Sequence, residues 1–256
     1  MTEAIRKIIA RSNRIVFLTG LGSVVECGAR DLWNSDLFYD IENKYHMSPE
    51  QLLSAGEYSS RKERFYNFYK KEVISYLPKP DETYRIIKSL EEEDRLEAVI
   101  SFNIFGLEKL AGIKNVIEVA GSVYYNYCPG CNKSFDVDYL LKSSSIPVCD
   151  ECKKALRPNI RLLGERVDND LYTDAAIACS MADTVVVLGA NLESSKIQFV
   201  TGHYTGNNLI LLTKEERFGD KYADYTLYGS IKDNLTAIFK ESDNKPEPET
   251  AGFDDE

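Results

Sequence analysis

Short runs of apolar, mostly β-branched residues recur along the chain and predict its strands. They are RIVFLTG (14–20), EAVIS (97–101), NVIEVAG (115–121), TVVVLG (184–189), NLILLT (208–213) and YTLY (225–228). These runs are apolar throughout instead of alternating with polar residues, which is typical of parallel strands covered on both faces. The pattern therefore predicts a buried parallel sheet.

Between several of these runs the apolar spacing becomes that of a helix, as in 81–94 and 169–182. Alternating strands and helices predict an α/β protein with a Rossmann-like, doubly wound parallel sheet. Two stretches interrupt the alternation, one helical and one polar and cysteine-bearing. We therefore assign a Rossmann-like lobe to 1–33, 81–122 and 157–240, and an inserted smaller lobe to a helical part (34–80) and a zinc-ribbon part (123–156).

Composition narrows the function classes. The chain is 43% hydrophobic and 28% charged, as in ordinary globular proteins, with a formal charge of −10. The stretch 241–256 has seven acids and one lysine, a net of −6, and almost no apolar residue, so we expect a disordered acidic tail. An acidic chain is a poor candidate for nucleic-acid binding. No segment has the roughly 20 apolar residues of a membrane span, and the N-terminus lacks a signal-peptide core. We expect a cytoplasmic protein.

Four cysteines form the strongest chemical signal. Cys128 and Cys131 make one C-x-x-C pair, Cys149 and Cys152 make a second, and seventeen residues separate the pairs. Four thiolates at this spacing can surround one zinc ion, whereas incidental cysteines would have no reason to be paired. Because no further ligand lies nearby in the sequence, we expect a closed, structural site that folds a segment poor in apolar residues.

The other two cysteines do not belong to this pattern. Cys179 lies in an apolar helical pattern and is most simply a core residue. Cys27 follows a glycine loop and either packs in the core or faces a ligand.

That loop is TGLGS (19–23), directly after the first predicted strand. Glycines at a strand-to-helix turn let the backbone approach a phosphate, although the same pattern also suits a tight turn with no ligand. The third glycine of a dehydrogenase fingerprint is missing, and no second strand ends in an acid about 20 residues later. A Rossmann dehydrogenase is therefore disfavoured.

Taken together, the segments resemble the sirtuins, the NAD-dependent protein-lysine deacylases, from about residue 10 to 238. TGLGSVVECGARDLW lies where sirtuins have the motif G-A-G-x-S…G-I-P-D-F-R. SFNIFGLEKLAG corresponds to their T-Q-N-I-D-x-L-H-x-x-A-G, and VIEVAGS to their V-x-E-L-H-G. The two cysteine pairs follow. LRPNIRLLGE then stands for R-P-x-V-V-x-F-G-E, VVVLGANL for the G-T-S-L turn, and LLT (211–213) for the strand end beside the adenosine ribose.

The resemblance implies NAD or ADP-ribose and an acyl-lysine protein or peptide as ligands, bound in a cleft between the two lobes. Carried over position by position, the resemblance implies that Gly20, Gly22 and Ser23 hold the phosphates and that Asn103 and Ile104 line the nicotinamide–ribose pocket, with Asp31 near the flexible loop. It implies that Gly189 and Asn191 meet phosphate and ribose and that Thr213 meets the adenosine side. Gly164 and Glu165 would border the acyl-peptide channel.

The chain departs from the sirtuin pattern where catalysis takes place. Ala120 occupies the position of the histidine that serves as general base in sirtuins. The loss of a positioned base typically costs about 10²–10⁴-fold in rate. Phe102 and Phe105 replace a Gln and an Asp of the pattern, and Leu32-Trp33 replaces its Phe-Arg pair. These aromatic side chains either reshape the nicotinamide pocket or merely pack. His46 is the other candidate base, although a lone histidine in a helical segment is usually a surface residue.

Two functions remain open from the sequence. One is a sirtuin-like protein-lysine deacylase of deacetylase type, weakened at Ala120 or limited to NAD cleavage or ADP-ribosyl transfer. The other is a catalytically silent protein that binds NAD or ADP-ribose. In RFYNFYKKEV (64–73), Asn67 and Lys70 stand where sirtuins that remove acidic acyl groups carry Tyr and Arg, but a solvated helix face explains the lysine equally well.

Overall fold

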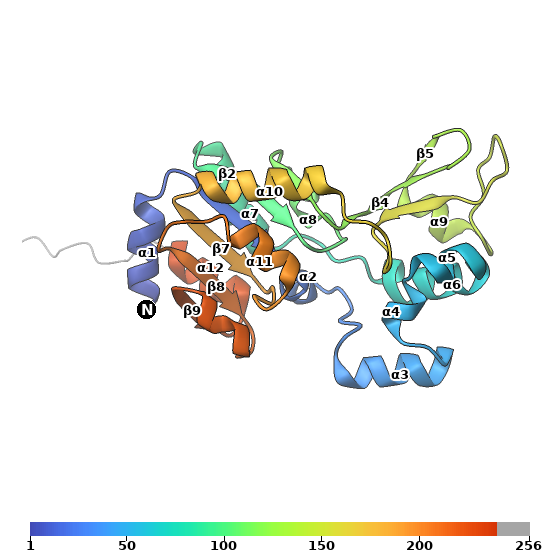
Figure 1. The fold of residues 1–256 in the computed structure, drawn as a ribbon, viewed down its shortest axis with the longest axis horizontal. Helices are drawn as coiled ribbons and strands as arrows, with labels where there is room; N and C mark the ends of the chain where they lie inside the picture. The colour runs from blue at the N-terminus through green and yellow to red at the C-terminus, as the bar shows by residue number, and fades with distance from the viewer. Residues whose placement is uncertain (240–256) are drawn as a thin grey trace, which may run out of the picture.

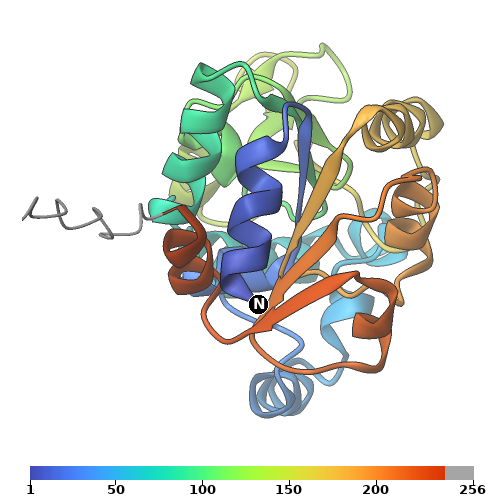
Figure 2. The same cartoon turned by 90° about the vertical axis from the view of Figure 1, so that its left-hand side faces the viewer.

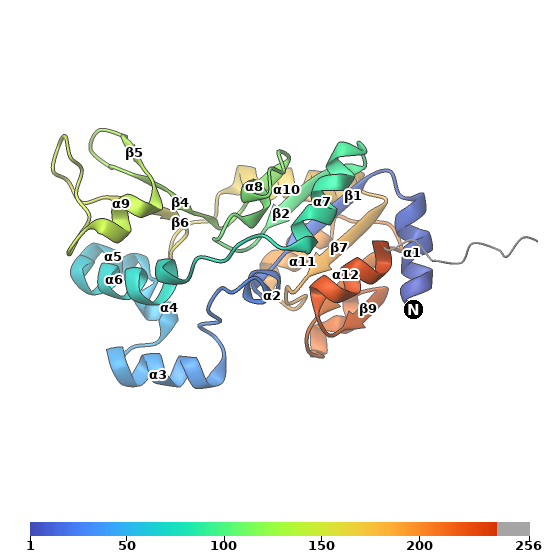
Figure 3. The ribbon, with the colours of Figure 1, turned by 180° about the vertical axis from the view of Figure 1, so that it is seen from behind.

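The computed structural model describes residues 1–239, so the acidic tail predicted for 241–256 lies outside the described residues. The molecule is elongated, with a large lobe around the N-terminus and a smaller lobe at the opposite end that carries α3 to α6, β5 and α9 (Figure 1; Figure 3 shows the reverse side). Within the described residues, no helix is both long and apolar enough to cross a membrane.

A six-stranded parallel sheet forms the centre of the large lobe and confirms the predicted fold class. The strand order is β3-β2-β1-β7-β8-β9, which is the Rossmann arrangement. The strands are β1 (Ile15–Thr19), β2 (Leu96–Ser101), β3 (Val116–Glu118), β7 (Thr184–Leu188), β8 (Leu209–Thr213) and β9 (Tyr225–Tyr228). Five of them match the predicted runs closely, whereas β3 ends before Val119, where the chain turns.

Helices cover both faces of this sheet, which explains why its strands are apolar throughout (Figure 2). One face packs against α1 (Thr2–Arg11), α7 (Glu82–Glu92) and α12 (Ile231–Phe239). The other face packs against α10 (Asn169–Met181) and α11 (Ser195–Thr201). Successive residues of β1 alternate between these cores, with Phe17 in the first and Val16 and Leu18 in the second. No face of β1 is left for polar side chains.

The strand order reverses between β1 and β7, and this reversal decides where a ligand can bind. In an open α/β sheet, the loops that leave two such strands run in opposite directions and open a crevice at the carboxyl ends. Here these loops begin at Gly20, before the short helix α2 (Leu21–Glu26), and at Gly189. The glycine loop therefore meets the G-A-N-L turn at the crevice.

The helical part of the small lobe consists of short pieces. It contains α3 (Ser35–Tyr45), α4 (Pro49–Leu52), α5 (Ala55–Ser60), α6 (Lys62–Phe68), the π-helical turn η1 (Tyr69–Val73) and the 3₁₀ turn η2 (Ile74–Tyr76). Side chains cap several starts: Ser54 accepts from the backbone N–H of Glu57 at 3.1 Å. Phe65, Tyr66, Phe68 and Tyr69 are completely buried and form the centre of this lobe's core.

The cysteine-bearing part adds a small antiparallel sheet of order β5-β4-β6. Its elements are β4 (Gly121–Tyr127), β5 (Ser134–Phe135), α9 (Val137–Lys142) and β6 (Arg157–Ile160). The sheet therefore extends beyond 123–156 on both sides, because β4 and β6 pair with each other across that stretch. The remaining elements, α8 (Leu107–Leu110) and η3 (Phe218–Tyr222), lie in loops of the large lobe.

Candidate functional site

Close backbone contact at the crevice explains the glycines. The N–H of Gly22 donates to the carbonyl oxygen of Gly189 at 2.9 Å, and the N–H of Gly20 donates to Leu188 at 2.9 Å. A Cβ at position 20 would lie 2.5 Å from the Gly189 oxygen, and one at position 22 would lie 2.8 Å from the Gly189 Cα. Gly189 itself has φ +60°, which disfavours a side chain. The glycines thus let the two loops touch at the crevice, and the N–H groups of Gly20 and Gly22 are already bonded within the protein.

Ser23 turns its side chain into the protein. Its hydroxyl donates to the carbonyl oxygen of Gly20 at 2.8 Å and accepts from the Tyr84 hydroxyl at 3.3 Å, and only 3% of the residue is exposed. Any phosphate contact of Ser23 therefore falls to its backbone N–H, while its side chain stiffens the loop.

Asn103 belongs to a buried polar network beneath this loop. Its side-chain amide donates to Thr19 Oγ1 and to Glu108 Oε1, both at 3.3 Å, and its oxygen accepts from the backbone N–H of Phe105 at 2.8 Å. Thr19 also donates to Glu108. Every hydrogen-bonding atom of the Asn103 amide group is thus held by a neighbour, so the side chain has one fixed orientation.

Glu108 is the unexpected member of the network. It is completely buried, Oε2 has no hydrogen-bond partner among the described residues, and burial raises the pKa of the carboxyl group. Sequence reasoning missed this residue, although the motif showed it: Glu108 stands where T-Q-N-I-D-x-L-H has its histidine.

Ala120 lies in the turn between β3 and β4, at the carboxyl end of the edge strand of the large sheet. Its carbonyl oxygen accepts from the backbone N–H of Arg161 at 3.0 Å. The following residue must be glycine, because Gly121 has φ +77° and a Cβ there would lie 2.0 Å from the Asn159 oxygen. The turn that would present a histidine is therefore intact, but the methyl group of Ala120 cannot accept a proton.

Neither histidine of the chain replaces that base in this structure. His46 is exposed at the C-terminal end of α3 in the left-handed conformation, with φ 57°. His203 is exposed after α11, and its Nδ1 lies 2.7 Å from the carbonyl oxygen of Phe199.

The substituted loop residues separate into packing and surface positions. Phe105 and Leu32 are buried in the core of the small lobe. Phe102 is half-buried and packs edge-on against Tyr172, with ring centroids 6.3 Å apart. Trp33 is 49% exposed and donates through its indole N–H to Glu50 at 2.9 Å. Of these three aromatic residues, Phe102 is the one next to Asn103 in the sequence, and it is only half-buried.

Asp31 lies in the loop between α2 and α3, where it accepts from the backbone N–H of Trp33 at 3.0 Å. Its neighbour Arg30 forms an ion pair with Glu72, a carboxylate that is only 4% exposed. Lys44 and Tyr45 also donate to Glu72, each at 2.7 Å. These contacts join the loop to α3 and to the helical part of the small lobe.

The other predicted cofactor positions lie at the carboxyl ends of the sheet or beside it. Asn191 closes its own turn by accepting from the N–H of Glu193 at 2.9 Å, and Thr213 ends β8 with 8% of the residue exposed. Ile104 is half-buried, and its carbonyl oxygen accepts from Val123 at 2.9 Å. The fold thus brings Gly20, Gly22, Gly189 and Asn103 to one edge. The cofactor roles of all these residues stay a prediction.

The predicted channel border is part of a braced turn. Glu165 accepts from the backbone N–H of Leu162 at 2.8 Å and from the Arg157 guanidinium at 2.5 Å, and Gly164 has φ +88°. Leu163 exchanges backbone hydrogen bonds with Leu53 and Ala55, at 3.0 and 2.9 Å. This turn therefore connects β6 to the helical part of the small lobe, and its role toward a peptide stays a prediction.

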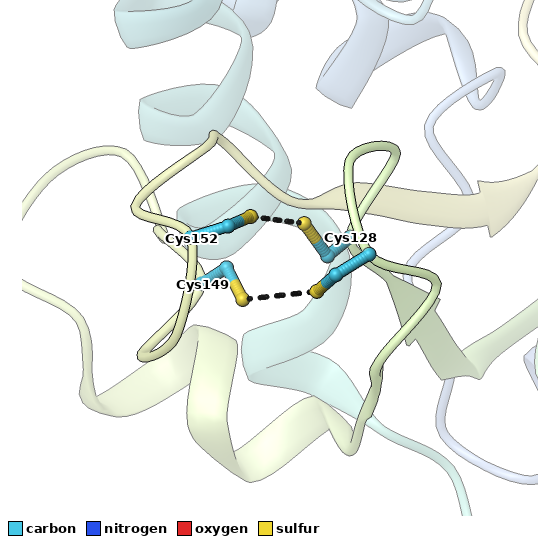
Figure 4. Close-up of side chains that lie close together, drawn as sticks. Cys128, Cys149 and Cys152 are labelled. Atoms are coloured by element: carbon cyan, nitrogen blue, oxygen red, sulfur yellow. Dashed lines mark hydrogen bonds between the residues drawn. The ribbon is translucent and has the colours of Figure 1, made fainter.

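The four predicted zinc ligands converge. The sulfur atoms of Cys128, Cys131, Cys149 and Cys152 all lie within 4.8 Å of one another (Figure 4). The Cys128–Cys152 and Cys131–Cys149 sulfurs are 3.1 and 3.6 Å apart. Tetrahedral zinc with Zn–S bonds of about 2.3 Å needs sulfurs about 3.8 Å apart, so the donor set fits one zinc ion.

The remaining cysteines are ordinary packing residues. Burial and the nearby charge of Asp81 raise the pKa of the Cys27 thiol to about 12. Burial likewise raises the pKa of the Cys179 thiol to about 12. Both stay protonated at neutral pH, which makes them poor nucleophiles.

Sequence reasoning also missed Arg161. This residue stands where the motif R-P-x-V-V-x-F-G-E has its second valine. Its guanidinium donates to the Tyr172 hydroxyl at 2.9 Å, while Nη1 is buried with no hydrogen-bond partner among residues 1–239. A charged side chain thus occupies an apolar position of the motif, next to Ala120.

Comparison with known proteins agrees with this geometry. The sequence profile of the Sir2 family matches residues 20–195. An NAD-dependent protein deacetylase from Clostridium acetobutylicum is 35% identical, over 91% of this chain and 96% of the relative. One from Staphylococcus aureus is 34% identical, over 93% and 96%.

Solved structures agree as well. A histidine-to-alanine variant of Sir2 with a deacetylated p53 peptide and 3′-O-acetyl ADP ribose has a TM-score of 0.79 and 29% identity, over 93% of this chain and 96% of that one. Sir2 with a p53 peptide and NAD⁺ has a TM-score of 0.77 and 28% identity, over 93% and 95%.

Proposed function

This chain belongs to the Sir2 family, and we propose that it is an NAD-dependent protein deacetylase whose activity is low because position 120 is alanine. The reaction class follows from homology at 34–35% identity over more than nine-tenths of the chain. The observation that supports NAD binding is the close approach of Gly20 and Gly22 to Gly189, which brings the glycine loop and the G-A-N-L turn together at the carboxyl ends of β1 and β7, where a Rossmann sheet opens its crevice.

When bound, NAD supplies a ribose carbon that receives the acyl oxygen while nicotinamide leaves with the bonding electron pair. The chain's own contribution to this step is placement. We infer that Asn103, fixed by its neighbours, shapes the nicotinamide–ribose pocket, and that the loop braced by Ser23 and Tyr84 lies against the phosphates. Such positioning accounts for a large part of many enzymatic rate enhancements.

The later step, removal of a proton from the ribose hydroxyl, has no side-chain base at position 120. A missing general base costs about 10²–10⁴-fold in rate, so we expect slow completion of deacetylation. Nicotinamide release precedes that step, and it does not require the missing group. The same observation therefore supports a second function, NAD cleavage or ADP-ribosyl transfer without complete deacetylation.

The four-cysteine site has a structural role in this proposal. Its ligands join the loop after β4 to the loop before β6, and no water-activating position is offered, since all four donors are thiolates. A cytoplasmic location is part of the same proposal, supported by the arrangement of these cysteines as a metal-ligand set instead of disulfides.

One experiment separates the functions. Nicotinamide release and loss of the acetyl group are measured in parallel on an acetyl-lysine peptide, with a reaction without peptide for comparison. Equal amounts of nicotinamide and deacetylated peptide indicate a deacetylase. Nicotinamide without deacetylated peptide indicates NAD cleavage or ADP-ribosyl transfer. NAD binding without release of either product contradicts both enzymatic functions and indicates a silent binding protein.

A further inference from the structure

A cavity of about 750 Å³ opens on the small lobe, between the start of α6 and the loop after α9. None of the predicted cofactor or channel residues lines it. Such a strongly basic lining attracts anions and repels cations. Its charged side chains are five cations and one acid, namely Arg61, Lys62, Arg64, Lys70, Lys71 and Glu63.

Two of these cations hold the walls of the cavity in place. The Lys70 ammonium donates to the carbonyl oxygens of Ser143 and Ser145, at 2.7 Å each, and so ties the loop after α9 to η1. The Arg64 guanidinium pairs with Glu57, which is only 6% exposed. The walls are therefore fixed before a ligand arrives, which lowers the entropic cost of binding.

The other cations have no acidic partner within residues 1–239. Arg61 and Lys71 are exposed and take part in no ion pair there, and the Lys62 ammonium donates only to the carbonyl oxygen of Ser59, at 3.0 Å. Five cations less Glu63 and the nearby Glu57 leave a local charge of +3, although the chain as a whole carries −10. The cavity is thus a basic site on an acidic protein, and its counter-charge is not supplied by its own walls.

The stretch 241–256, which we call the acidic segment, has the complementary charge. It holds seven acids and one lysine, a net of −6, with almost no apolar residue. Opposite charges attract over about 10 Å at moderate ionic strength and guide two surfaces together. The chain therefore carries both a basic cavity and an acidic peptide that suits it.

The position of α12 indicates which copy supplies the acidic segment. Arg6 of α1 donates to the carbonyl oxygens of Ala237 and Ile238, at 2.7 and 3.1 Å, so α12 ends beside α1. Helix α1 lies at the end of the molecule opposite the small lobe (Figure 3). A flexible chain of sixteen residues has an end-to-end distance of about 20–24 Å. A compact protein of this size has a radius of gyration of about 18 Å and hence a diameter of about 45 Å. A second copy is therefore the more accessible source of a cavity.

We propose that the acidic segment of one copy docks in the basic cavity of a second copy. Each copy offers one segment and one cavity, so the contact is heterologous and links copies head to tail. Because exposed ion pairs are individually weak and are screened by salt, the association depends on protein concentration and on ionic strength. The inference is independent of the proposed function, since neither NAD nor an acyl peptide takes part.

The test is sedimentation of the full chain over a series of concentrations. We expect self-association at about 50 mM salt that becomes at least about tenfold weaker at about 500 mM. A cavity variant, Arg61→Glu with Lys71→Glu, and a segment variant should each associate at least about tenfold more weakly than the unaltered protein. The segment variant changes Glu247, Glu249 and Glu256 to Gln and Asp254 and Asp255 to Asn.

A mixture of the two variants gives the sharpest result. The cavity variant keeps its acidic segment and the segment variant keeps its cavity, so the mixture should associate again but stop at pairs. The control, Arg85→Glu with Lys114→Glu at exposed positions of the large lobe, has the same net charge as the cavity variant and should associate like the unaltered protein. Monomers at every concentration, association that survives in either variant alone, or a mixture that stays monomeric would each overturn the inference.

Discussion

The side-chain amide of Asn103 donates to Glu108 Oε1 at 3.3 Å, so the residue expected at the nicotinamide–ribose pocket is oriented by a buried acid. Burial raises the pKa of that acid above its ordinary value of 4.5. When a carboxyl group binds its proton more tightly in the folded chain than in the unfolded chain, the free energy of unfolding falls as pH rises above that ordinary value.

The stability of the Glu108→Gln variant relative to that of the unaltered protein should therefore increase as pH rises. The amide keeps an oxygen acceptor for Thr19 and Asn103 and cannot ionise. We expect the melting temperature of the variant, minus that of the unaltered protein, to increase between about pH 5 and about pH 8. Glu82→Gln, at an exposed position of α7, serves as the control and should give a constant difference. A difference for Glu108→Gln that falls with pH would contradict the assignment.

Zinc removal should unfold the small antiparallel sheet. Elemental analysis of the purified protein should give about one zinc per chain. Cys149→Ala, at a buried ligand, should abolish zinc binding and lower the melting temperature strongly, since metal binding and folding are coupled in such modules. Cys27→Ala, outside the cluster, should keep the zinc. Stable, folded protein that contains no zinc would show that the four thiols serve another purpose.

NAD and ADP-ribose should raise the melting temperature in proportion to the logarithm of their concentration. ADP-ribose should bind at least as tightly as NAD, because Phe102, next to Asn103 in the sequence, replaces a polar side chain on the nicotinamide side. Gly22→Ala should abolish the shift, since its Cβ would lie 2.8 Å from the Gly189 Cα. Gly56→Ala is the matched control, because the nearest atom to a Cβ there is 3.8 Å away. Unchanged melting at millimolar ligand would indicate a vestigial crevice.

Ala120→His should increase deacetylation, because the turn that presents this position is intact. A fully aligned base could restore about 10⁴-fold. We expect less, since Phe102 cannot make the hydrogen bonds of the glutamine it replaces, and misplacement alone can cost about 10²-fold. The double change with Phe102→Gln should therefore exceed the single one, and Leu110→His, at an exposed position of α8, should have no effect. Strong NAD turnover by the unaltered protein would mean that another group serves as base.

Removing Glu72, which joins the loop between α2 and α3 to the helical part of the small lobe, should lower the free energy of unfolding. Glu72→Ala leaves Arg30, Lys44 and Tyr45 without their shared acceptor, and breaking a buried ion pair typically costs about 3–5 kcal/mol. Lys44 is largely exposed and can turn to water, so we expect a value near the lower end, measured by chemical denaturation. Glu63→Ala on the neighbouring helix α6 is the control. A change of less than about 0.5 kcal/mol would show that the contacts are not maintained in solution.

Local pattern determined much of this protein. Apolar runs predicted the strands of the large sheet because a strand covered on both faces has no place for polar side chains. The paired cysteines predicted their own cluster, since two C-x-x-C knuckles supply all four ligands whatever surrounds them. The motif order was sufficient to indicate the family, and the departure at Ala120 was visible from the sequence alone.

Only the tertiary structure determined which residues distant in sequence are neighbours in the fold. The pairing of Gly22 with Gly189 across 167 positions of sequence depends on the reversal of strand order between β1 and β7, which no local pattern contains. Whether Phe105 packs or faces the cleft was open until the small lobe's core was known. The motif places Glu108 and Arg161 at unusual positions, but only the structure shows that each has a buried polar atom without a partner among the described residues. Burial and pairing are properties of neighbours distant in sequence, so the chemistry of this cleft appears only when the chain is folded.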